Sequence, residues 1–328
     1  MIAFLKKGEL ISLLSKLGEK LEIIAPIMVE GEPSFGTWTG QNLALDKNTL
    51  CPPTEFFMPQ KETLFKYIQD CGRYTFVEPL PKQRMLFGIR PCDLRAVFIL
   101  DRIFGSEPQD IAYLEKRRST IVAAFNCTRP DETCLCAKLG SGPECERGYD
   151  LLMTELPSGY LVETGSPAGM LILKDYPQFF HQPEEPQISE KRKLMDDARK
   201  VAESRRQTIE GIRKAIKNAD WDAIGGQCLC CGGCTFICPI CHCFNILDVG
   251  VPDGERIRCR DSCIFSGFSR MAGGGNPRRS QGERMQNWFR DKFEYLPEKI
   301  GMVGCVGCGR CSIVCLAEID RWNLEALL

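Results

Sequence analysis

Two runs of closely spaced cysteines constrain this chain more than any other feature. The first run, "CLCCGGCTFICP", has the spacing C-x2-C-x2-C-x3-C-P with which bacterial ferredoxins hold a [4Fe–4S] cluster. A second run, "CVGCGRCSIVC", repeats the cysteine spacing nearer the C-terminus. Tetrahedral zinc sites usually take two separated Cys-x-x-Cys pairs, so the pattern favours two [4Fe–4S] clusters.

The fourth cysteine of each run is expected to serve the other cluster, as it does in two-cluster ferredoxins. The predicted ligands of cluster 1 are therefore Cys228, Cys231, Cys234 and Cys315. Those of cluster 2 are Cys305, Cys308, Cys311 and Cys238. The runs lie 67 positions apart (305 − 238), and the sequence between them, such as "SQGERMQNWFRDKFEYL", is helical in character. A mostly helical, ferredoxin-like dicluster domain is therefore predicted over residues 221–328.

The composition indicates a metal protein and not a secreted disulfide protein. The 20 cysteines in 328 residues cluster at two- and three-residue intervals. The sequence shows no secretion signal and no apolar run long enough to span a membrane, so we expect a cytoplasmic protein. A net charge of −1 argues against nucleic acid as a partner. The two histidines, His181 and His242, are too few for a catalytic triad or a three-histidine zinc site.

Residues 1–180 are predicted to form a mixed α/β domain, which makes the fold class α+β. Helical spacing marks "GELISLLSKLG" and "DLRAVFILDRIF", whereas "KLEIIAPIMV", "RMLFGI" and "STIVAAFNC" have the character of strands. The stretch "LLMTELPSGYLVET" is predicted to be a hairpin that turns at Ser158-Gly159. Residues 181–220 are predicted to be a linker with one long polar helix over 188–217, whose narrow apolar face includes Leu194, Ala198, Val201, Ile209, Ile212 and Ile216.

Four cysteines of the N-terminal half form a candidate site for a third [4Fe–4S] cluster. Cys92 and Cys127 each follow a predicted strand, and parallel neighbours would bring both to one edge of a sheet. Cys134 and Cys136 lie in a loop shortly after Cys127. Two other interpretations stay open: these thiols are ordinary buried residues, or Cys145 replaces one of them as the fourth ligand. The extra thiols Cys241, Cys243, Cys259 and Cys263 are candidates for packing, hydrogen bonding or a further metal.

The same motifs resemble a known family. "CLCCGGCTFICPICHCFNILDV", "FGIRPCDLRAVFILDRIF", "NCTRPDETCLCAKLGSGP" and "DSCIFSGFSRMAGG" are similar to an iron–sulfur subunit of anaerobic sulfite reductase and to the beta subunit of cytoplasmic sulfhydrogenase. Iron–sulfur subunits attached to heterodisulfide reductase flavoprotein assemblies look similar too. The resemblance covers nearly the whole chain and places family cysteines at Cys92, Cys127, Cys134 and Cys136. Leu135, where the family often has Phe, and Leu316, where Pro is usual, depart from the pattern without removing a ligand.

The resemblance implies an iron–sulfur electron-transfer subunit of an anaerobic, cytoplasmic oxidoreductase complex. Such subunits relay electrons between a flavin-containing subunit that oxidises NAD(P)H and a terminal reductase, hydrogenase or heterodisulfide reductase subunit. The chain contains no G-x-G-x-x-G, so no dinucleotide site of its own and no catalytic residue is expected. The alternative is a thiol–disulfide or sulfur-reducing enzyme that uses Cys92 or the Cys134–Cys136 pair.

Overall fold

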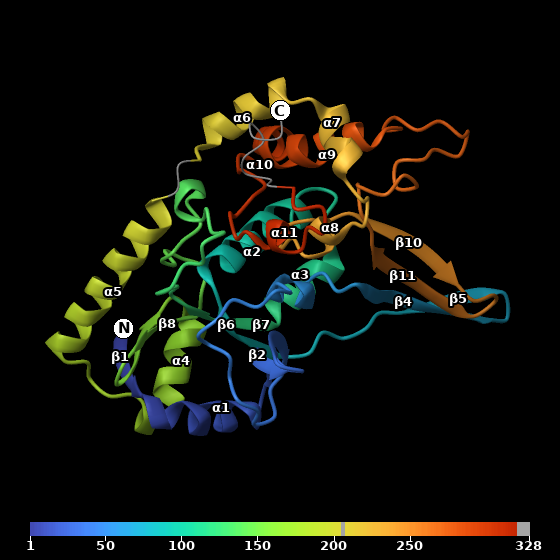
Figure 1. The fold of residues 1–328 in the computed structure, drawn as a ribbon. Helices are drawn as coiled ribbons and strands as arrows, with labels where there is room; N and C mark the ends of the chain where they lie inside the picture. Colours follow the sequence, from blue (N-terminus) through green and yellow to red (C-terminus); the bar gives the residue numbers. More distant parts are fainter. Residues whose placement is uncertain (205–206, 320–328) are drawn as a thin grey trace.

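A seven-stranded mixed sheet, sheet A, is the centre of the N-terminal half (Figure 1). The structure is a computed structural model that describes residues 1–204 and 207–319. The strand order is β1-β9-β8-β7-β6-β2-β3, with parallel pairs from β2 through β6 and β7 to β8 and antiparallel pairs elsewhere. Its strands are β1 (Ile2–Lys6), β2 (Glu22–Val29), β3 (Glu32–Thr37), β6 (Arg84–Ile89), β7 (Thr120–Phe125), β8 (Leu151–Leu156) and β9 (Gly159–Thr164).

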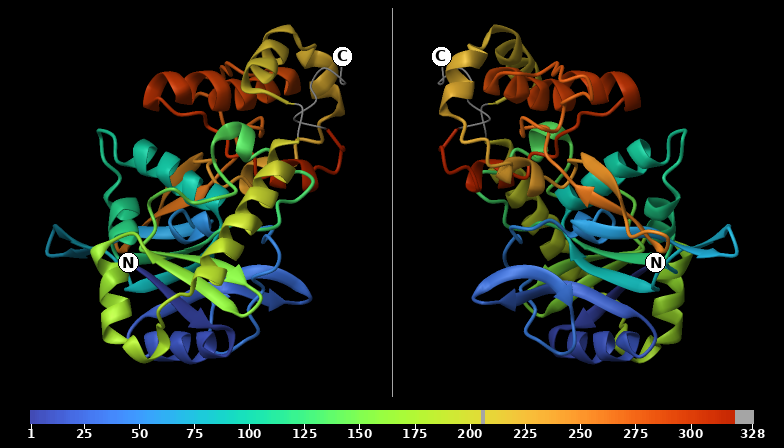
Figure 2. Two further views of the ribbon diagram at one scale, coloured as in Figure 1. Left: turned by 90° about the vertical axis from the view of Figure 1, so that its left-hand side faces the viewer. Right: turned by 90° about the vertical axis from the view of Figure 1, so that its right-hand side faces the viewer.

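Helices cover both faces of sheet A, so the predicted α/β architecture of this half is confirmed (Figures 1 and 2). On one face lie α1 (Leu10–Gly18) and α4 (Pro167–Asp175), whose buried leucine and isoleucine side chains share a core with β2, β6 and β7. On the other face lie α2 (Pro91–Phe104) and α3 (Ile111–Arg118). The predicted hairpin is also confirmed, because β8 and β9 pair in antiparallel fashion across the turn at Ser158.

A second sheet, sheet B, joins the two halves of the chain. Its order is β10-β11-β4-β5, and all of its pairs are antiparallel. The strands β4 (Lys61–Asp70) and β5 (Arg73–Val77) belong to the N-terminal half, whereas β10 (Phe244–Val249) and β11 (Gly254–Arg260) lie between the two cysteine runs. The mostly helical region therefore contains a hairpin in addition to its helices. The division at 180 and 220 remains a prediction, and sheet B crosses it.

The linker contains two helices where the sequence predicts one. They are α5 (Glu185–Glu203) and α6 (Ile209–Asn218), and Thr208 begins the second by accepting a hydrogen bond from the backbone N–H of Gly211. The buried faces also differ from the predicted one, since Met195 and Ala202 are buried and Val201 is about half exposed. Residues 205–206 of the predicted helix, and 320–328 of the predicted dicluster domain, lie outside the described residues.

Short helices surround the cysteine runs and pack above α2 (Figure 1). They are α7 (Trp221–Gln227), α8 (Gly233–Phe236), α9 (Gln281–Arg290), α10 (Leu296–Ile300) and α11 (Arg310–Ile313). Ser280 and Glu283 form a capping box at the start of α9, and a π-helical turn, Asp291–Tyr295, joins α9 to α10. The helical prediction for this stretch is thus confirmed. Along the described residues, no helix is both long and apolar enough to cross a membrane.

Candidate iron–sulfur centres

All 20 cysteines lie in the described part of the chain, and none of them forms a disulfide bond. Of the twelve predicted ligands, only Cys231 is exposed; the others are buried or half-buried. Around residues 1–204 and 207–319, no three His, Cys, Asp or Glu side chains converge on one point as a single metal ion would require. A [4Fe–4S] cluster makes a different demand, because each of its four thiolates binds a separate iron atom at a corner of a larger core.

The four thiols predicted for cluster 1 are brought together around one small cavity. Its lining includes Cys228, Cys231, Cys234 and, from the other run, Cys315. Cys234 lies in α8, and Gly232 before it has a φ of +74°, a left-handed conformation that glycine adopts at no steric cost. Cys230, between two of these thiols, is not a lining residue. Its Sγ instead lies 3.6 Å from Nη2 of the buried Arg284.

The second run repeats this local geometry. Gly309 has a φ of +74° and precedes α11, which carries Cys311 and packs against α8. Cys238 from the first run packs with Cys308 in one apolar cluster. Burial raises the pKa of Cys305 to about 12, and Cys238 and Cys308 lie close enough to contribute to that rise. Cys311 lies in a neighbouring core cluster that Cys305 also contacts.

The N-terminal thiols meet at the edge of sheet A where β6 and β7 end. These strands are parallel neighbours, as predicted, and Cys92 lies in the first turn of α2 after β6 while Cys127 follows β7. A hydrogen bond with Cys136, followed by burial, raises the pKa of Cys134. Burial also raises the pKa of Cys92 and Cys127, and Cys134 is close enough to add to both shifts.

Cys145 lies close to the same thiols, so it stays an alternative to one of them as the fourth ligand. Burial raises its pKa, and Cys127 is the nearest group that adds to the shift. Its backbone N–H donates to Oδ1 of Asn126 at 2.9 Å, which holds the Cys145 segment beside the end of β7.

Hydrogen bonds attach the second cysteine run to the loop that carries Cys134 and Cys136. The backbone N–H of Leu135 donates to the carbonyl of Gly307 at 2.7 Å, and Oγ of Ser141 donates to the carbonyl of Val306 at 2.6 Å. A Cβ on Gly307 would lie 2.5 Å from the carbonyl carbon of Leu135, so this close approach requires glycine. The Cys308 thiol is also among the groups that raise the pKa of Cys92.

Comparison with known proteins agrees with this arrangement. The family of 4Fe-4S dicluster domains matches residues 227–319, which include every predicted ligand of clusters 1 and 2. "Sulfhydrogenase 2 subunit beta" of Pyrococcus furiosus is 32% identical over 286 residues, covering 85% of this chain and 83% of the relative. The chain belongs to the sulfhydrogenase beta-subunit family. It is therefore an iron–sulfur protein of the oxidoreductase class that carries [4Fe–4S] clusters and transfers electrons.

In this member of the family, a buried lysine that was not among the predicted site residues lies beside a predicted ligand of cluster 2. Lys292 is on the π-helical turn, and its Nζ lies 3.3 Å from Sγ of Cys238 and 3.5 Å from Sγ of Cys241. The pattern that reveals it is the apolar stripe of α9, because a lysine at position 292 continues the spacing of Met285, Trp288 and Phe289.

The remaining thiols fall into two groups, apart from Cys259, which is half-buried on β11. Cys243 and Cys263 share a hydrogen bond, and Cys241 shares one with Cys238. These three extra cysteines therefore lie beside Cys238, a predicted ligand of cluster 2. Cys51 and Cys71, by contrast, are exposed, and Cys71 is at the turn between β4 and β5 with a φ of +48°.

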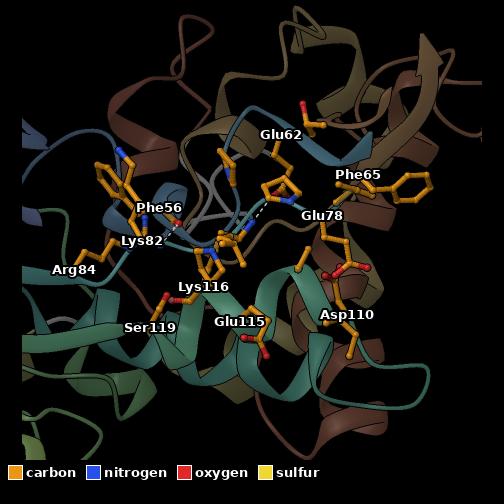
Figure 3. Close-up of a pocket in the computed structure, with 18 of the residues that line it drawn as sticks. Phe56, Glu62, Phe65, Glu78, Lys82, Arg84, Asp110, Glu115, Lys116 and Ser119 are labelled. Carbon is orange, nitrogen blue, oxygen red and sulfur yellow. Dashed lines mark hydrogen bonds and ion pairs between the residues drawn. The ribbon is translucent and has the colours of Figure 1, made fainter. Parts of the chain in front are cut away.

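A cavity of about 950 Å³ opens between β4 and α3, away from the thiols (Figure 3). Its lining combines aromatic and charged side chains, among them Phe65, Glu78, Lys82 and Glu115. Glu62 and Lys116 form an ion pair on its wall. None of the described residues that line this cavity is a cysteine, so it offers no thiol for chemistry on a bound molecule.

Proposed function

We propose that this chain is the electron relay of a cytoplasmic, multisubunit oxidoreductase and catalyses no reaction itself. It would accept electrons from a flavin-containing subunit that oxidises NAD(P)H and pass them to a terminal reductase, hydrogenase or heterodisulfide reductase subunit. The name of the Pyrococcus furiosus relative, a beta subunit of a sulfhydrogenase, supports membership of such a complex.

The observation that carries this proposal is that the predicted ligand sets of neighbouring clusters lie next to one another in the molecule. Cys315 shares a cavity with Cys228, Cys231 and Cys234, which supports their assignment to cluster 1. Cys238 lies with Cys305 and Cys308, which supports the assignment of these three to cluster 2, and Cys311, the remaining thiol of the second run, is assigned to it by its spacing. Each run thus contributes its fourth cysteine to the other site, and α8 packs against α11 between them.

The third cluster extends the same succession into the N-terminal half. Cys92, Cys127, Cys134 and Cys136 converge at the β6–β7 edge, and the loop of Cys134 is bonded to the second run at Gly307. Four thiols suffice for one [4Fe–4S] cluster, which, when bound, accepts and releases single electrons. Burial raises the pKa of Cys92 and of Cys127, and iron binding would displace the protons of both thiols.

The alternative, a thiol–disulfide or sulfur-reducing enzyme, fits these thiols less well. Reactive cysteines have lowered pKa values and partial exposure, whereas Cys92, Cys127 and Cys134 are buried and their pKa values are raised. Iodoacetamide labelling distinguishes the two functions. A relay predicts that the N-terminal thiols resist labelling until iron is removed, whereas an enzyme predicts immediate alkylation of Cys92 or of the Cys134–Cys136 pair.

The relay itself is tested by a potentiometric titration of anaerobically purified protein, followed by electron paramagnetic resonance. Each cluster should be reduced within the range of about −700 to +450 mV known for iron–sulfur centres. If no cluster can be reduced in this range, the clusters only brace the fold and the proposal fails. In a separate experiment, co-purification followed by mass spectrometry would identify the neighbouring subunits and the terminal acceptor.

A further inference from the structure

Lys292 is a buried cation whose immediate surroundings are sulfur atoms. Its side chain is 2% exposed, and its three N–H donors match three acceptors. Nζ lies 3.3 Å from Sγ of Cys238, 3.5 Å from Sγ of Cys241 and 3.4 Å from the carbonyl oxygen of Gly304. The ring of Trp288 covers the ammonium group at 4.9 Å. The position of the charge is therefore fixed to within hydrogen-bond distance of a predicted ligand of cluster 2.

The backbone holds Lys292 in this position as well. The N–H of Gly304 donates to the carbonyl of Lys292 at 2.6 Å, so the residue before Cys305 is bound at both its N–H and its carbonyl. A Cβ on Gly304 would lie 2.9 Å from the Cα of Lys292, so the two segments could not approach as closely with a larger residue. π-helical turns are rare and are often found at functional sites, and Lys292 is on such a turn.

No carboxylate of the described residues forms an ion pair with Lys292, although the neighbouring Asp291 is close enough to interact with its charge. Arg310, the other buried cation close to cluster 2, is paired with Asp93 and so contributes little net charge. A buried ammonium group is costly unless it is hydrogen-bonded, and its partners here are the sulfurs of Cys238 and Cys241 and the carbonyl of Gly304.

We infer that Lys292 sets the reduction potential of cluster 2 through its hydrogen bond to Cys238 and its buried positive charge. This inference rests on the proposed function, which assigns Cys238 to that cluster. The potential of an iron–sulfur centre depends on its net charge, its burial and the hydrogen bonds to its sulfurs. Reduction adds one negative charge, so a cation held beside the ligand sulfur favours the reduced state and raises the potential. The first run has a weaker counterpart, because Arg284 contacts Cys230, which is not a predicted ligand.

The test is a set of three variants in the full-length, anaerobically prepared protein. Lys292→Met removes the charge and keeps the length of the side chain, Lys292→Arg keeps the charge, and Lys299→Met removes an exposed charge from the adjacent helix α10. Iron is counted first, and each paramagnetic signal is then titrated against potential. In Lys292→Met, we expect unchanged iron and a tenfold or larger loss in the equilibrium constant for reducing one cluster, which is about 59 mV or more for one electron. The other paramagnetic signals of Lys292→Met should keep their wild-type potentials, and so should all signals of Lys299→Met. Lys292→Arg should keep most of the wild-type potential of the affected cluster.

Two results would overturn the inference. One is a Lys292→Met protein with full iron and unshifted potentials, and the other is a loss of about four iron atoms in Lys292→Met and Lys292→Arg alike, which would make Lys292 a structural residue. A different result would show that the proposed function itself is wrong. In that case, wild-type protein would contain no reducible cluster whose signal depends on Cys238. Replacing Cys238 by Ser in otherwise wild-type protein provides that comparison.

Discussion

Asp93 and Arg310, 217 positions apart in the sequence, form a two-pronged ion pair in which both side chains are buried. Nη1 and Nη2 of Arg310 lie 2.5 and 2.9 Å from the two carboxylate oxygens of Asp93. Nε of Arg310 donates to the carbonyl of Thr49 at 2.9 Å. Asp93 follows Cys92, and Arg310 lies between Cys308 and Cys311, so this pair fastens the N-terminal thiols to the second cysteine run.

Removing one partner of this pair should destabilise the protein strongly. Arg310→Gln leaves the Asp93 carboxylate buried without its cation, a situation that typically costs about 3–5 kcal/mol. We expect the midpoint of anaerobic urea unfolding to fall clearly. The matched control is Arg256→Gln, which breaks the exposed pair with Asp248 and should leave the midpoint nearly unchanged. Equal midpoints for the two variants would show that the buried pair does not stabilise the protein more than the exposed pair does.

The N-terminal ligand set predicts the iron content. Wild-type protein should hold about 12 iron atoms per chain, and the double variant Cys134→Ser/Cys136→Ser should hold about four fewer while its ferredoxin-type signals persist. Cys71→Ser, which alters an exposed cysteine at the β4–β5 turn, should retain all of the iron. A wild-type content of about 8, or a double variant with no loss, would make these thiols packing residues.

The close packing of the two cysteine runs predicts a magnetic interaction. Cys238 lies with Cys305 and Cys308, and Cys315 lies with the first run, so reduced clusters at the two sites should be near neighbours. Dithionite-reduced protein should therefore give paramagnetic resonance spectra broadened or split by spin coupling. Simple, additive spectra of isolated clusters would contradict the exchange of fourth cysteines.

The lack of a dinucleotide fingerprint predicts how the isolated chain behaves with nucleotides. Purified protein should not oxidise NADH or NADPH at a measurable rate, because the sequence contains no G-x-G-x-x-G and no other sign of a flavin site. Addition of a flavoprotein partner from the same complex should start electron flow to the clusters. Sustained oxidation of either nucleotide by chain that is free of flavoprotein would refute this prediction.

Much of the fold could be predicted from short-range patterns. The strands β2, β6 and β7 of sheet A, the α1 stripe of Leu10, Leu13 and Leu17, and the β8–β9 hairpin follow from local periodicity, whereas the edge strands β1 and β3 were not predicted. The meeting of Cys92 and Cys127 follows from one topological rule, since the carboxyl ends of parallel neighbours share an edge.

Long-range pairing was beyond such patterns. β11 pairs with β4, nearly two hundred positions away, and the choice depends on packing around the buried Arg258, which contacts Glu62 and Asp110. The separate start of α6 is marked by a single capping residue, Thr208, within a sequence whose composition remains helical. Lys292 falls on the apolar stripe of α9, so its burial could be read from the spacing, but its sulfur partners come from a distant part of the chain and could not.

The cavity that Cys315 shares with Cys228, Cys231 and Cys234 has a consequence for biosynthesis. On the exchanged assignment, neither ferredoxin-type site has its full set of ligands while the ribosome has made only the first run. Completing the site that contains Cys228 requires a thiol 87 positions further along (315 − 228), after the β10–β11 hairpin and α9 have been synthesised. The iron of these two sites can therefore be fully bound only after both cysteine runs have been synthesised, so the iron content of the protein reports whether the two runs have folded together.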